Sequence, residues 1–490
     1  MAERKGVTGR LIGWIDARFG LSHPFLRPVP EFALNPFYWL GALTVVAFVI
    51  QGVTGMIMML YYIPSPTQAY SSTQFIFQTV NNGRFLETVH LYTAYAMIML
   101  AFMHMMRGYF VSVHKKPREA MWLVGMLMGF VTLGFGFTGY LLPWTVVSKS
   151  ATDVGVGMVS ALPQPISSLL TFLIVGSGGD AAELLRFFDL HIVILPAALL
   201  ILLVVKMYML ESHGIAEPAS GPPATKRKLL PIFPDVTMYL FELSLLFGTG
   251  MLLISALFPL ALPPEYTPLA ASQYTPQPDW YFLWIYQVLK VSIFEGQTGL
   301  ATALSLITVV FLALILLPFI DRGKSKEISR RPIYITLGLV FAGEVAVLSY
   351  WGLITPGETI PVEQAALVIG GTALLISIGS ILTYRLMYSR ARSRLPTGAA
   401  NLVSHTELRN GAAFVGLVAA GALSIGGALN TVVAVAMGDW SVTTLLTFAG
   451  SLTALGLVVL GSAYLTYRLD FKTGSIRRRV SIFERGLNNE

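Results

Sequence analysis

Apolar residues fill ten long runs along the chain, and short polar or basic stretches separate them. A helix needs about 20 apolar residues to cross roughly 30 Å of hydrocarbon, and each run has that length. We therefore predict an all-α polytopic membrane protein with about ten transmembrane helices. The predicted spans are 37–61, 87–111, 121–142, 189–210, 236–259, 299–320, 332–354, 362–387, 412–437 and 443–467.

Basic residues gather in every second polar segment. If the N-terminus is cytoplasmic, the cytoplasmic segments hold nearly all lysines and arginines, including the run at 226–228. The positive-inside rule then predicts that both termini lie in the cytoplasm. The net charge of +7 reflects this topology signal and a face for anionic lipid, so it indicates no nucleic-acid partner. The basic residues predicted outside are Arg84, Lys149, Arg186 and Lys290.

Composition supports a membrane protein and limits its cofactors. Hydrophobic residues make up 54% of the chain and charged residues 12%, whereas soluble proteins have about 25% charged residues. The chain has no cysteine, which excludes a disulfide, a thiolate-held iron–sulfur cluster and a thioether-attached haem within it. Any such centre belongs to a partner subunit.

One interval of fourteen residues recurs in the first three spans. Fourteen residues are nearly four helical turns, so the members of each pair share a helix face about 21 Å apart. Imidazoles at that rise can each take one axial site of a haem, and flanking glycines remove side chains that would strike the porphyrin. The alternative is a packed polar histidine with chance glycine pairs. We predict a two-haem path in a four-helix bundle, from the pairs His90/His104, Gly41/Gly55 and Gly125/Gly139.

The fourth span supplies the opposite ligands. It runs in the same direction as the second span and begins with His191, so we expect His90 and His191 to bind an outer haem. The inner haem would have His104 on one side. Its opposite ligand should lie fourteen or fifteen residues after His191, where Val205 and Lys206 stand.

Several unusual sequence motifs then indicate a family. They are QGVTG at 51–55, HxxR at 104–107, KKPREAMW at 115–122, TGYLLPW at 138–144, LRFFDLH at 185–191 and PDWY at 278–281. With them, residues 1–215 resemble the four-helix core of cytochrome b in Rieske/cytochrome b complexes, closest to the chloroplast-type form. Residues 236–354 resemble that form's separate subunit four, after a basic Pro/Gly-rich linker at 216–235. The additional helices and basic tail at 355–490 have no counterpart in the resemblance.

The resemblance implies a quinol-oxidation pocket at the outer side, beside the outer haem. Its lining would come from the loop after the third span and from Pro278, Asp279, Trp280 and Tyr281. Asp279 would accept a proton from a quinol hydroxyl, since a partly desolvated carboxyl has a raised pKa, and Tyr281 would orient it. The family more often has Glu at this position. The alternative is an ordinary Pro-Asp turn with interfacial aromatic anchors.

Arginines near the predicted ligands are candidates for haem propionate contacts. Arg107 lies one turn after His104, and Arg186 lies five residues before His191. The alternative for both is an arginine that reaches the lipid headgroups. Relatives often carry an arginine where this chain has Glu87, and the chloroplast-type form attaches an extra haem through a cysteine where this chain has Trp39. We therefore expect no extra haem.

Lys206 is the largest departure from the resemblance, because the chloroplast-type family has its fourth histidine there. A lysine amine binds iron only when it is deprotonated. The alternative is an ammonium group that reaches the cytoplasmic headgroups. We expect His104 and Lys206 to ligate the inner haem, with Gly55 and Gly125 placed at the same cytoplasmic level.

Two functional classes follow. The first is the cytochrome b subunit of a quinol-oxidising, proton-translocating complex, which divides quinol electrons between a Rieske-type partner and two non-covalent b-type haems. The second is a di-haem membrane anchor that relays electrons between quinone and a peripheral oxidoreductase, and such anchors lack a PDWY-type pocket. A haem-copper oxidase is excluded, because it needs about six membrane histidines.

The resemblance also implies partners and a location. We expect a Rieske iron–sulfur protein, a cytochrome c-type or other acceptor subunit, quinone, lipid and a second copy of the chain, in the plasma membrane of a prokaryote. Candidates for an inner quinone site are His114, Glu211 and His213, each of which is equally well a solvated helix-end residue.

Overall fold

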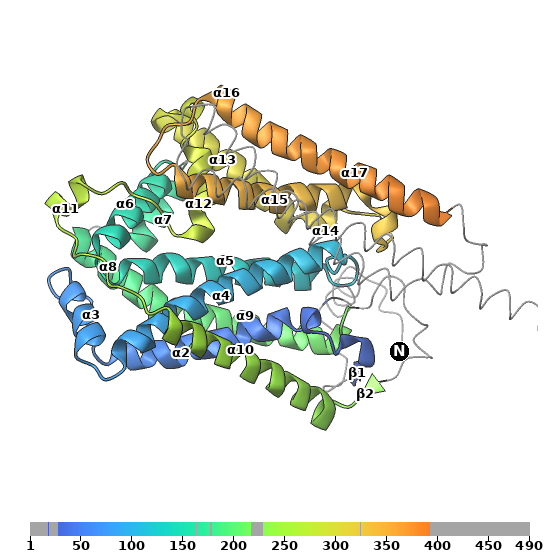
Figure 1. Ribbon diagram of the computed structural model, residues 1–490, viewed down its shortest axis with the longest axis horizontal. Helices are drawn as coiled ribbons and strands as arrows, with labels where there is room; N and C mark the ends of the chain where they lie inside the picture. The colour runs from blue at the N-terminus through green and yellow to red at the C-terminus, as the bar shows by residue number, and fades with distance from the viewer. Residues whose placement is uncertain are drawn as a thin grey trace, which may run out of the picture. The chain divides into compact units, whose positions relative to one another are not determined.

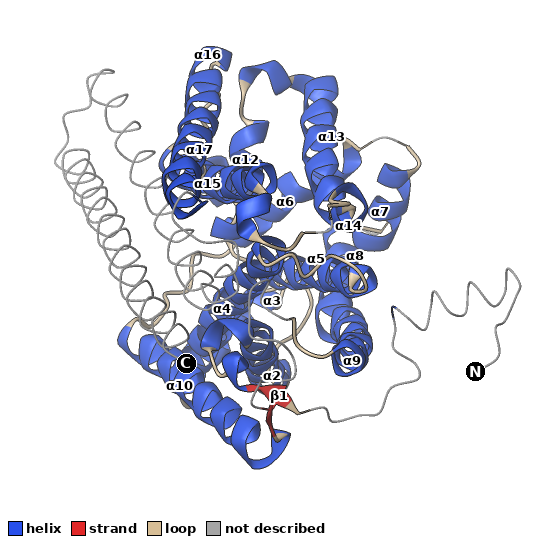
Figure 2. Ribbon diagram, turned by 90° about the vertical axis from the view of Figure 1, so that its right-hand side faces the viewer, coloured by secondary structure: helices blue, strands red, loops and turns tan. Residues whose placement is uncertain are grey.

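The computed structural model describes residue 18 and residues 28–162, 164–176, 179–216, 229–323 and 325–392. These residues are mostly helical, as Figure 2 shows. Eight of their helices are long and apolar enough to cross a membrane, and they coincide with the first eight predicted spans. The predicted all-α membrane fold is therefore confirmed. The last two predicted spans, 412–437 and 443–467, and most of the linker at 216–235 lie outside the described residues.

The described residues divide into two compact units. The first contains helices α2 to α14 and the turn at 355–359, and the second contains α15 to α17. The predicted domain division at residue 354 stays a prediction. In the second unit α15 (Pro332–Ile354) packs along α17 (Gly371–Arg392), with α16 (Val362–Ala365) between them in sequence.

Four membrane-spanning segments form the bundle of the first unit. The first packs against the second, the second against the third, and the third against the fourth, so they run side by side in Figure 1. The fourth is a composite of an α-helix, a π-helical turn and a second α-helix. The segments are α2 (Leu40–Met59), α4 (Gly83–Phe110), α5 (Glu119–Leu141) and the series α8 (Gly179–Asp189), η3 (Leu190–Ile194) and α9 (Leu195–His213).

A proline explains the break in the fourth segment. Pro196 has no N–H to donate to the preceding turn, so a regular α-helix loses a hydrogen bond there. The chain widens to a π-helix at Leu190–Ile194, immediately before the proline. Such π-turns occur frequently at functional sites, and this one contains His191.

An apolar layer fills the middle of the bundle. Its buried residues are Ala47 on α2, Met97 on α4 and Leu199 on α9, and side chains from α5 pack against them. Each lies about midway along its helix between the predicted outer and inner ligand levels. Because each residue is buried among apolar neighbours, the layer separates the two levels without polar groups. The partly buried members are Phe48, Met128, Val131, Phe135 and Phe247.

The remaining elements of the first unit surround this bundle. Helix α10 packs on α2 and α4, and the short strands β1 and β2 pair antiparallel, with Val29 opposite Leu230. Their bounds are β1 Val29–Pro30, α3 Ala69–Gln78, α6 Val146–Ser160, α7 Ile166–Ile174, β2 Leu229–Leu230, α10 Thr237–Leu257, α11 Pro268–Ser272, η6 Trp280–Phe282, α12 Leu283–Leu289, α13 Gly296–Ile315 and α14 Leu317–Ile320.

Candidate haem-binding and quinol-oxidation sites

His90 on α4 and His191 in the π-helical turn face each other in the half of the bundle that the sequence predicts to be the outer one. Their ring centroids are 6.4 Å apart, and the ring planes are inclined by 62°. A metal held by one nitrogen of each imidazole at about 2 Å places the two centroids roughly 6 Å apart. The spacing of the pair therefore fits a metal ion that the two imidazoles would hold between them.

Two threonines fix the orientation of these imidazoles. The hydroxyl of Thr54 lies 2.8 Å from Nδ1 of His90, and the hydroxyl of Thr138 lies 3.2 Å from Nδ1 of His191. Each hydroxyl also donates its own proton to a backbone carbonyl of its helix. Each therefore accepts the Nδ1–H of the imidazole, and Nε2 keeps a lone pair for a metal. Neither threonine was identified from the sequence alone.

The outer glycines lie directly against the outer imidazoles. A Cβ added to Gly55 would come within 3.3 Å of the His90 ring, and one added to Gly139 within 2.5 Å of the His191 ring. The shorter distance is one that real Cβ atoms do not show. Glycine is therefore required at Gly139 for the imidazole to take this position.

The inner level repeats this arrangement with a lysine in place of one histidine. A Cβ on Gly41 would come within 3.1 Å of the His104 ring, and one on Gly125 within 2.6 Å of Nζ of Lys206. The Lys206 amine thus lies against Gly125 in the same way as each of the three histidine rings lies against a glycine of a neighbouring helix. The expected placement of Gly55 at this level was wrong, because α2 runs outward from Gly41 and the later glycine reaches the outer level.

The inner level also has buried polar atoms that lack hydrogen-bond partners. Within the described chain, Nδ1 of His104 and one terminal nitrogen of Arg107 make no hydrogen bond. The Arg107 guanidinium lies 4.0 Å from the centroid of the Tyr38 ring, and Nζ of Lys206 donates to the Met121 carbonyl at 3.2 Å. Buried donors without acceptors are costly, so this level fits a polar group that the described part of the chain does not supply. A haem with its carboxylates meets that description.

Arg186 faces a different neighbour. Its guanidinium lies over the Phe172 ring of α7 at 5.5 Å and donates to the Phe172 carbonyl. Its predicted propionate contact therefore stays a prediction. The carboxyl of Glu87, one turn before His90, has a buried oxygen without a hydrogen-bond partner among the described residues.

The PDWY segment forms a turn between α10 and α13. Oδ1 of Asp279 accepts a hydrogen bond from the backbone N–H of Trp280 at 2.9 Å and caps η6. Oδ2 is buried, and no donor in the described chain completes a hydrogen bond to it. Burial raises the pKa of Asp279, while the Trp280 N–H and the Tyr95 hydroxyl lower it. The turn interpretation thus holds for one oxygen, and the other is free to receive a proton.

Aromatic residues enclose this carboxyl. Tyr281 is buried, and its hydroxyl would lie 2.7 Å from a Cβ on Gly136, so this glycine of α5 makes room for it. Burial, followed by the charges of Asp279, Tyr95 and Tyr140, raises the pKa of Tyr281 well above its usual value. Gly136, Tyr95 and Tyr140 were not identified from the sequence alone, although Tyr140 belongs to the TGYLLPW motif.

The loop after the third span lies beside the segment that leads to PDWY. The backbone N–H of Val146 donates to the Pro264 carbonyl at 2.9 Å, and that of Tyr266 donates to the Trp144 carbonyl at 3.1 Å. The structure thus brings together the two loops that the resemblance places around a quinol pocket.

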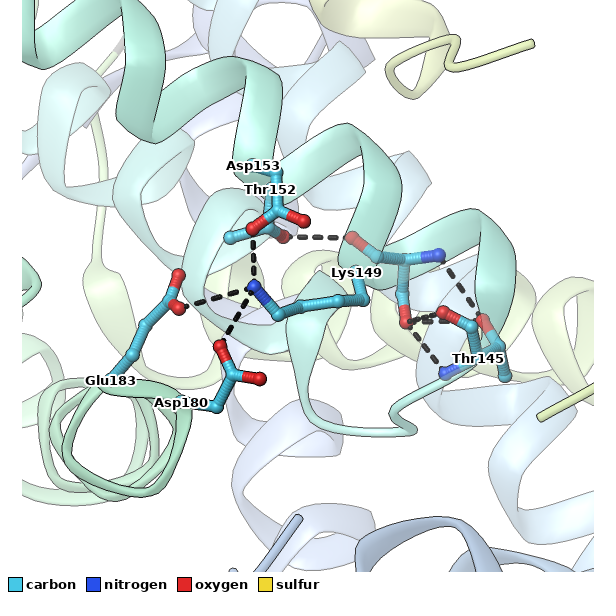
Figure 3. A network of polar contacts seen from close by, with 7 residues as sticks. Thr145, Lys149, Thr152, Asp153, Asp180 and Glu183 are labelled. Carbon is cyan, nitrogen blue, oxygen red and sulfur yellow. Dashed lines mark hydrogen bonds and ion pairs between the residues drawn. The ribbon is translucent and has the colours of Figure 1, made fainter. Parts of the chain in front are cut away.

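A buried lysine connects helix α6 to helix α8 through ion pairs. Lys149 is 5% exposed, and its Nζ forms ion pairs with Asp153 and with Asp180 and Glu183 at 3.3 Å each, as Figure 3 shows. Burial opposes the charge on Lys149, but the three carboxylates prevail and raise its pKa. Because α8 continues into the turn that contains His191, the network connects α6 to the segment with the predicted outer ligand.

The predicted inner quinone residues have other partners. His114 is fully buried, and its Nε2 lies 3.0 Å from Oδ2 of Asp321, whose Oδ1 pairs with Lys115 at 2.9 Å. Nδ1 of His213 lies 2.9 Å from the Met209 carbonyl of its own helix. His114 is therefore no solvated helix-end residue.

Comparison with known proteins identifies the family. Residues 27–214 match the family described as cytochrome b/b6/petB, and residues 270–370 match that described as cytochrome b(C-terminal)/b6/petD. A cytochrome bc complex cytochrome b subunit from Chlorobaculum thiosulfatiphilum is 33% identical over 344 residues, which cover 69% of this chain and 79% of that protein. Cytochrome b6 from Heliobacterium mobile is 40% identical over 193 residues, 39% of this chain and 90% of that protein.

A more distant relative and a solved structure agree with this. Cytochrome b from Sulfolobus acidocaldarius is 29% identical over 405 residues, covering 76% of this chain and 71% of that protein. A chain of a hyperthermophilic respiratory Complex III shares the fold with a TM-score of 0.58 at 23% identity, covering 80% of this chain and 98% of that chain. The chain therefore belongs to the cytochrome b family.

Proposed function

We propose that this chain is the cytochrome b subunit of a quinol-oxidising, proton-translocating respiratory complex of the bc type. The two electrons of a quinol separate: one passes to a Rieske-type iron–sulfur protein, and the other crosses the membrane to a quinone site on the cytoplasmic side. The observation that carries the proposal is the Asp279 carboxyl, which is anchored through one oxygen and open at the other. A relay anchor also exchanges protons with quinone, so the carboxyl by itself supports quinol chemistry; its place in a PDWY turn, which such anchors lack, favours the bc-type complex.

The four predicted ligands divide between two levels. His90 and His191 would hold an outer b-type haem, and His104 and Lys206 would hold an inner one. When bound, these haems supply the electron path through the apolar middle of the bundle. Arg107 supports the inner site, since its guanidinium has a nitrogen available for a haem carboxylate.

The protein's own part in quinol oxidation is to receive a proton and exclude water. Oδ2 of Asp279 accepts the proton of a quinol hydroxyl, while the Trp280 N–H holds Oδ1 in place. Burial brings the pKa of Asp279 upward, toward the pH at which a general base works well. The rings of Trp280 and Tyr281 keep water from this carboxyl, and Pro278 begins the turn that presents it.

The proposed complex determines the partners and the location. A Rieske protein and a cytochrome c-type or other acceptor subunit would receive electrons at the outer face. A second copy of the chain would complete a homodimer. The location would be the plasma membrane of a prokaryote, with both termini in the cytoplasm, as the distribution of basic residues favours.

An oxidant pulse distinguishes this function from a relay anchor. The quinol-reduced complex is given one addition of oxidant while an inhibitor blocks the inner quinone site, and haem b absorbance is followed. If quinol electrons separate, the first leaves to the oxidant side, the second has only the haem path, and haem b becomes more reduced. In a relay anchor haem b becomes only more oxidised, and that result would refute the proposal.

A further inference from the structure

Tyr95 joins the helix of the outer ligand to the quinol-site loop. It lies on α4, five residues after His90, and therefore on a different face of that helix. Its ring centroid lies 6.1 Å from that of Trp280 and 6.4 Å from that of Tyr281. These contacts place its ring against the turn that contains Asp279.

Three tyrosines lie close enough to the Asp279 carboxyl to interact with its charge, each from a different element. They are Tyr95 on α4, Tyr140 on α5 and Tyr281 on η6. Among the described residues, the Tyr95 hydroxyl is the one side-chain donor that lowers the pKa of Asp279, and the Trp280 N–H is the backbone donor. Tyr95 therefore differs in kind from the other two tyrosines.

Two donors from separate elements can determine the plane of a carboxyl. Asp279 has only two side-chain torsions, and the Trp280 N–H fixes Oδ1 from the turn itself. A second donor on a membrane helix would also hold the carboxyl relative to the bundle. Hydrogen bonds to a charged acceptor are strong, so the loss of this one should be measurable.

We propose that Tyr95 is a positioning residue for quinol oxidation, and that its hydroxyl orients the Asp279 carboxyl and stabilises the carboxylate that takes the quinol proton. This proposal rests on the proposed function. The proton moves from a quinol hydroxyl to Oδ2, the O–H bond of the quinol breaks, and Tyr95 keeps its own proton throughout.

The pH profile of quinol oxidation by the purified complex tests the proposal. Tyr95→Phe keeps the ring that packs on Trp280 and Tyr281 but removes the donor, so the Asp279 pKa rises and more of the carboxyl is protonated at a given pH. The acid limb of the rate should move to higher pH by about one unit, which is about a tenfold loss of rate on that limb. The quinol KM should change much less than kcat.

Tyr92→Phe is the matched control. The Tyr92 hydroxyl lies on the same helix and donates to the Phe258 carbonyl at 2.8 Å, so its loss should leave the acid limb in place. Tyr95→Leu, which also lacks the donor, should shift the limb in the same direction as Tyr95→Phe. Tyr95→Phe added to Asp279→Asn should have no further effect on the profile.

Infrared difference spectra give a readout that does not depend on turnover. The carboxyl band that disappears in Asp279→Asn should titrate at higher pH in Tyr95→Phe. A uniform loss of rate without a shift of the limb, or an equal shift in Tyr92→Phe, would overturn the Tyr95 proposal. If Asp279→Asn itself turns over normally, the proposed base fails; if it is inactive while the Tyr95→Phe profile is unchanged, only the Tyr95 proposal fails.

Discussion

Replacement of Lys206 by alanine should leave the inner haem without its sixth ligand. Nζ of Lys206 takes the position against Gly125 that the His191 ring takes against Gly139. Alanine has no donor atom and ends three methylenes and an amine short of that position. We therefore expect the inner iron to become five-coordinate and high-spin, while the outer haem stays unchanged.

The size of the effect follows from the arrangement of the sites. Only one of the two predicted haems loses a ligand, so half of the b-type haem should become able to bind carbon monoxide. Even groups that only support a metal ligand contribute about 10–100-fold to metal affinity, so loss of a direct ligand should weaken retention of the inner haem at least about tenfold. If Lys206 only reaches the lipid headgroups, its replacement would cause neither carbon monoxide binding nor loss of the inner haem.

Reduced-minus-oxidised and carbon monoxide difference spectra measure this directly, and they do not depend on quinol turnover. Lys206→His is the control, because it should restore a low-spin inner haem with two imidazoles at a shifted potential. A Lys206→Ala protein whose two haems both remain low-spin and unreactive to carbon monoxide would refute ligation and leave Lys206 as an interfacial lysine.

Four further outcomes are expected. Pyridine haemochrome analysis should find two haems per chain, both extracted by acid acetone, and a single or resistant haem would contradict the site assignment. Asp279→Asn should lower quinol oxidation about 100-fold or more with both haems in place, and near-normal turnover would make it only a turn residue. Gly139→Ala should displace the outer imidazole and the outer haem, whereas Gly52→Ala, whose Cβ meets nothing within 4 Å, should not. Lys149→Met should lower stability by about 2 kcal/mol, less than the roughly 3–5 kcal/mol of a fully buried pair, because two of its partners are half exposed. Since the pKa of Lys149 is raised in the folded state, the wild-type advantage in thermal unfolding should be fully present below the ordinary lysine pKa, and it should be lost as pH rises from there through the raised pKa.

Spacing within a helix could be predicted because it depends only on local geometry. The fourteen-residue interval placed His90 and His104 on one face of α4, and the mean hydropathy of the runs located the first eight spans. The misplacement of Gly55 had a simple cause, since consecutive spans alternate in direction and the first glycine of α2 is therefore the inner one. The order of the spans already contained that information.

Contacts between distant segments could not be predicted in the same way. Periodicity places Tyr95 on one face of a helix, but nothing in the sequence states that the Asp279 turn folds onto that face. The ion pairs of Lys149 could not be predicted for the same reason, because its partners Asp180 and Glu183 lie on another helix. Thr54 and Thr138 are a different case: each directly precedes a glycine of the repeat, so a repeated Thr-Gly pair was visible in the sequence.

The Thr-Gly pair also makes the two ligand levels chemically different, because it occurs only at the outer level. At the outer level both imidazoles have a threonine hydroxyl on Nδ1, which fixes ring orientation and leaves Nε2 for iron. The inner glycines follow Leu40 and Val124 instead, and Nδ1 of His104 has no partner within the described chain. The inner site thus combines one imidazole without that support and one lysine, whereas the outer site is symmetric. Since the groups around a ligand tune a haem, the two proposed haems should differ most through their ligands, and Lys206 is the position where that difference can be changed by a single substitution.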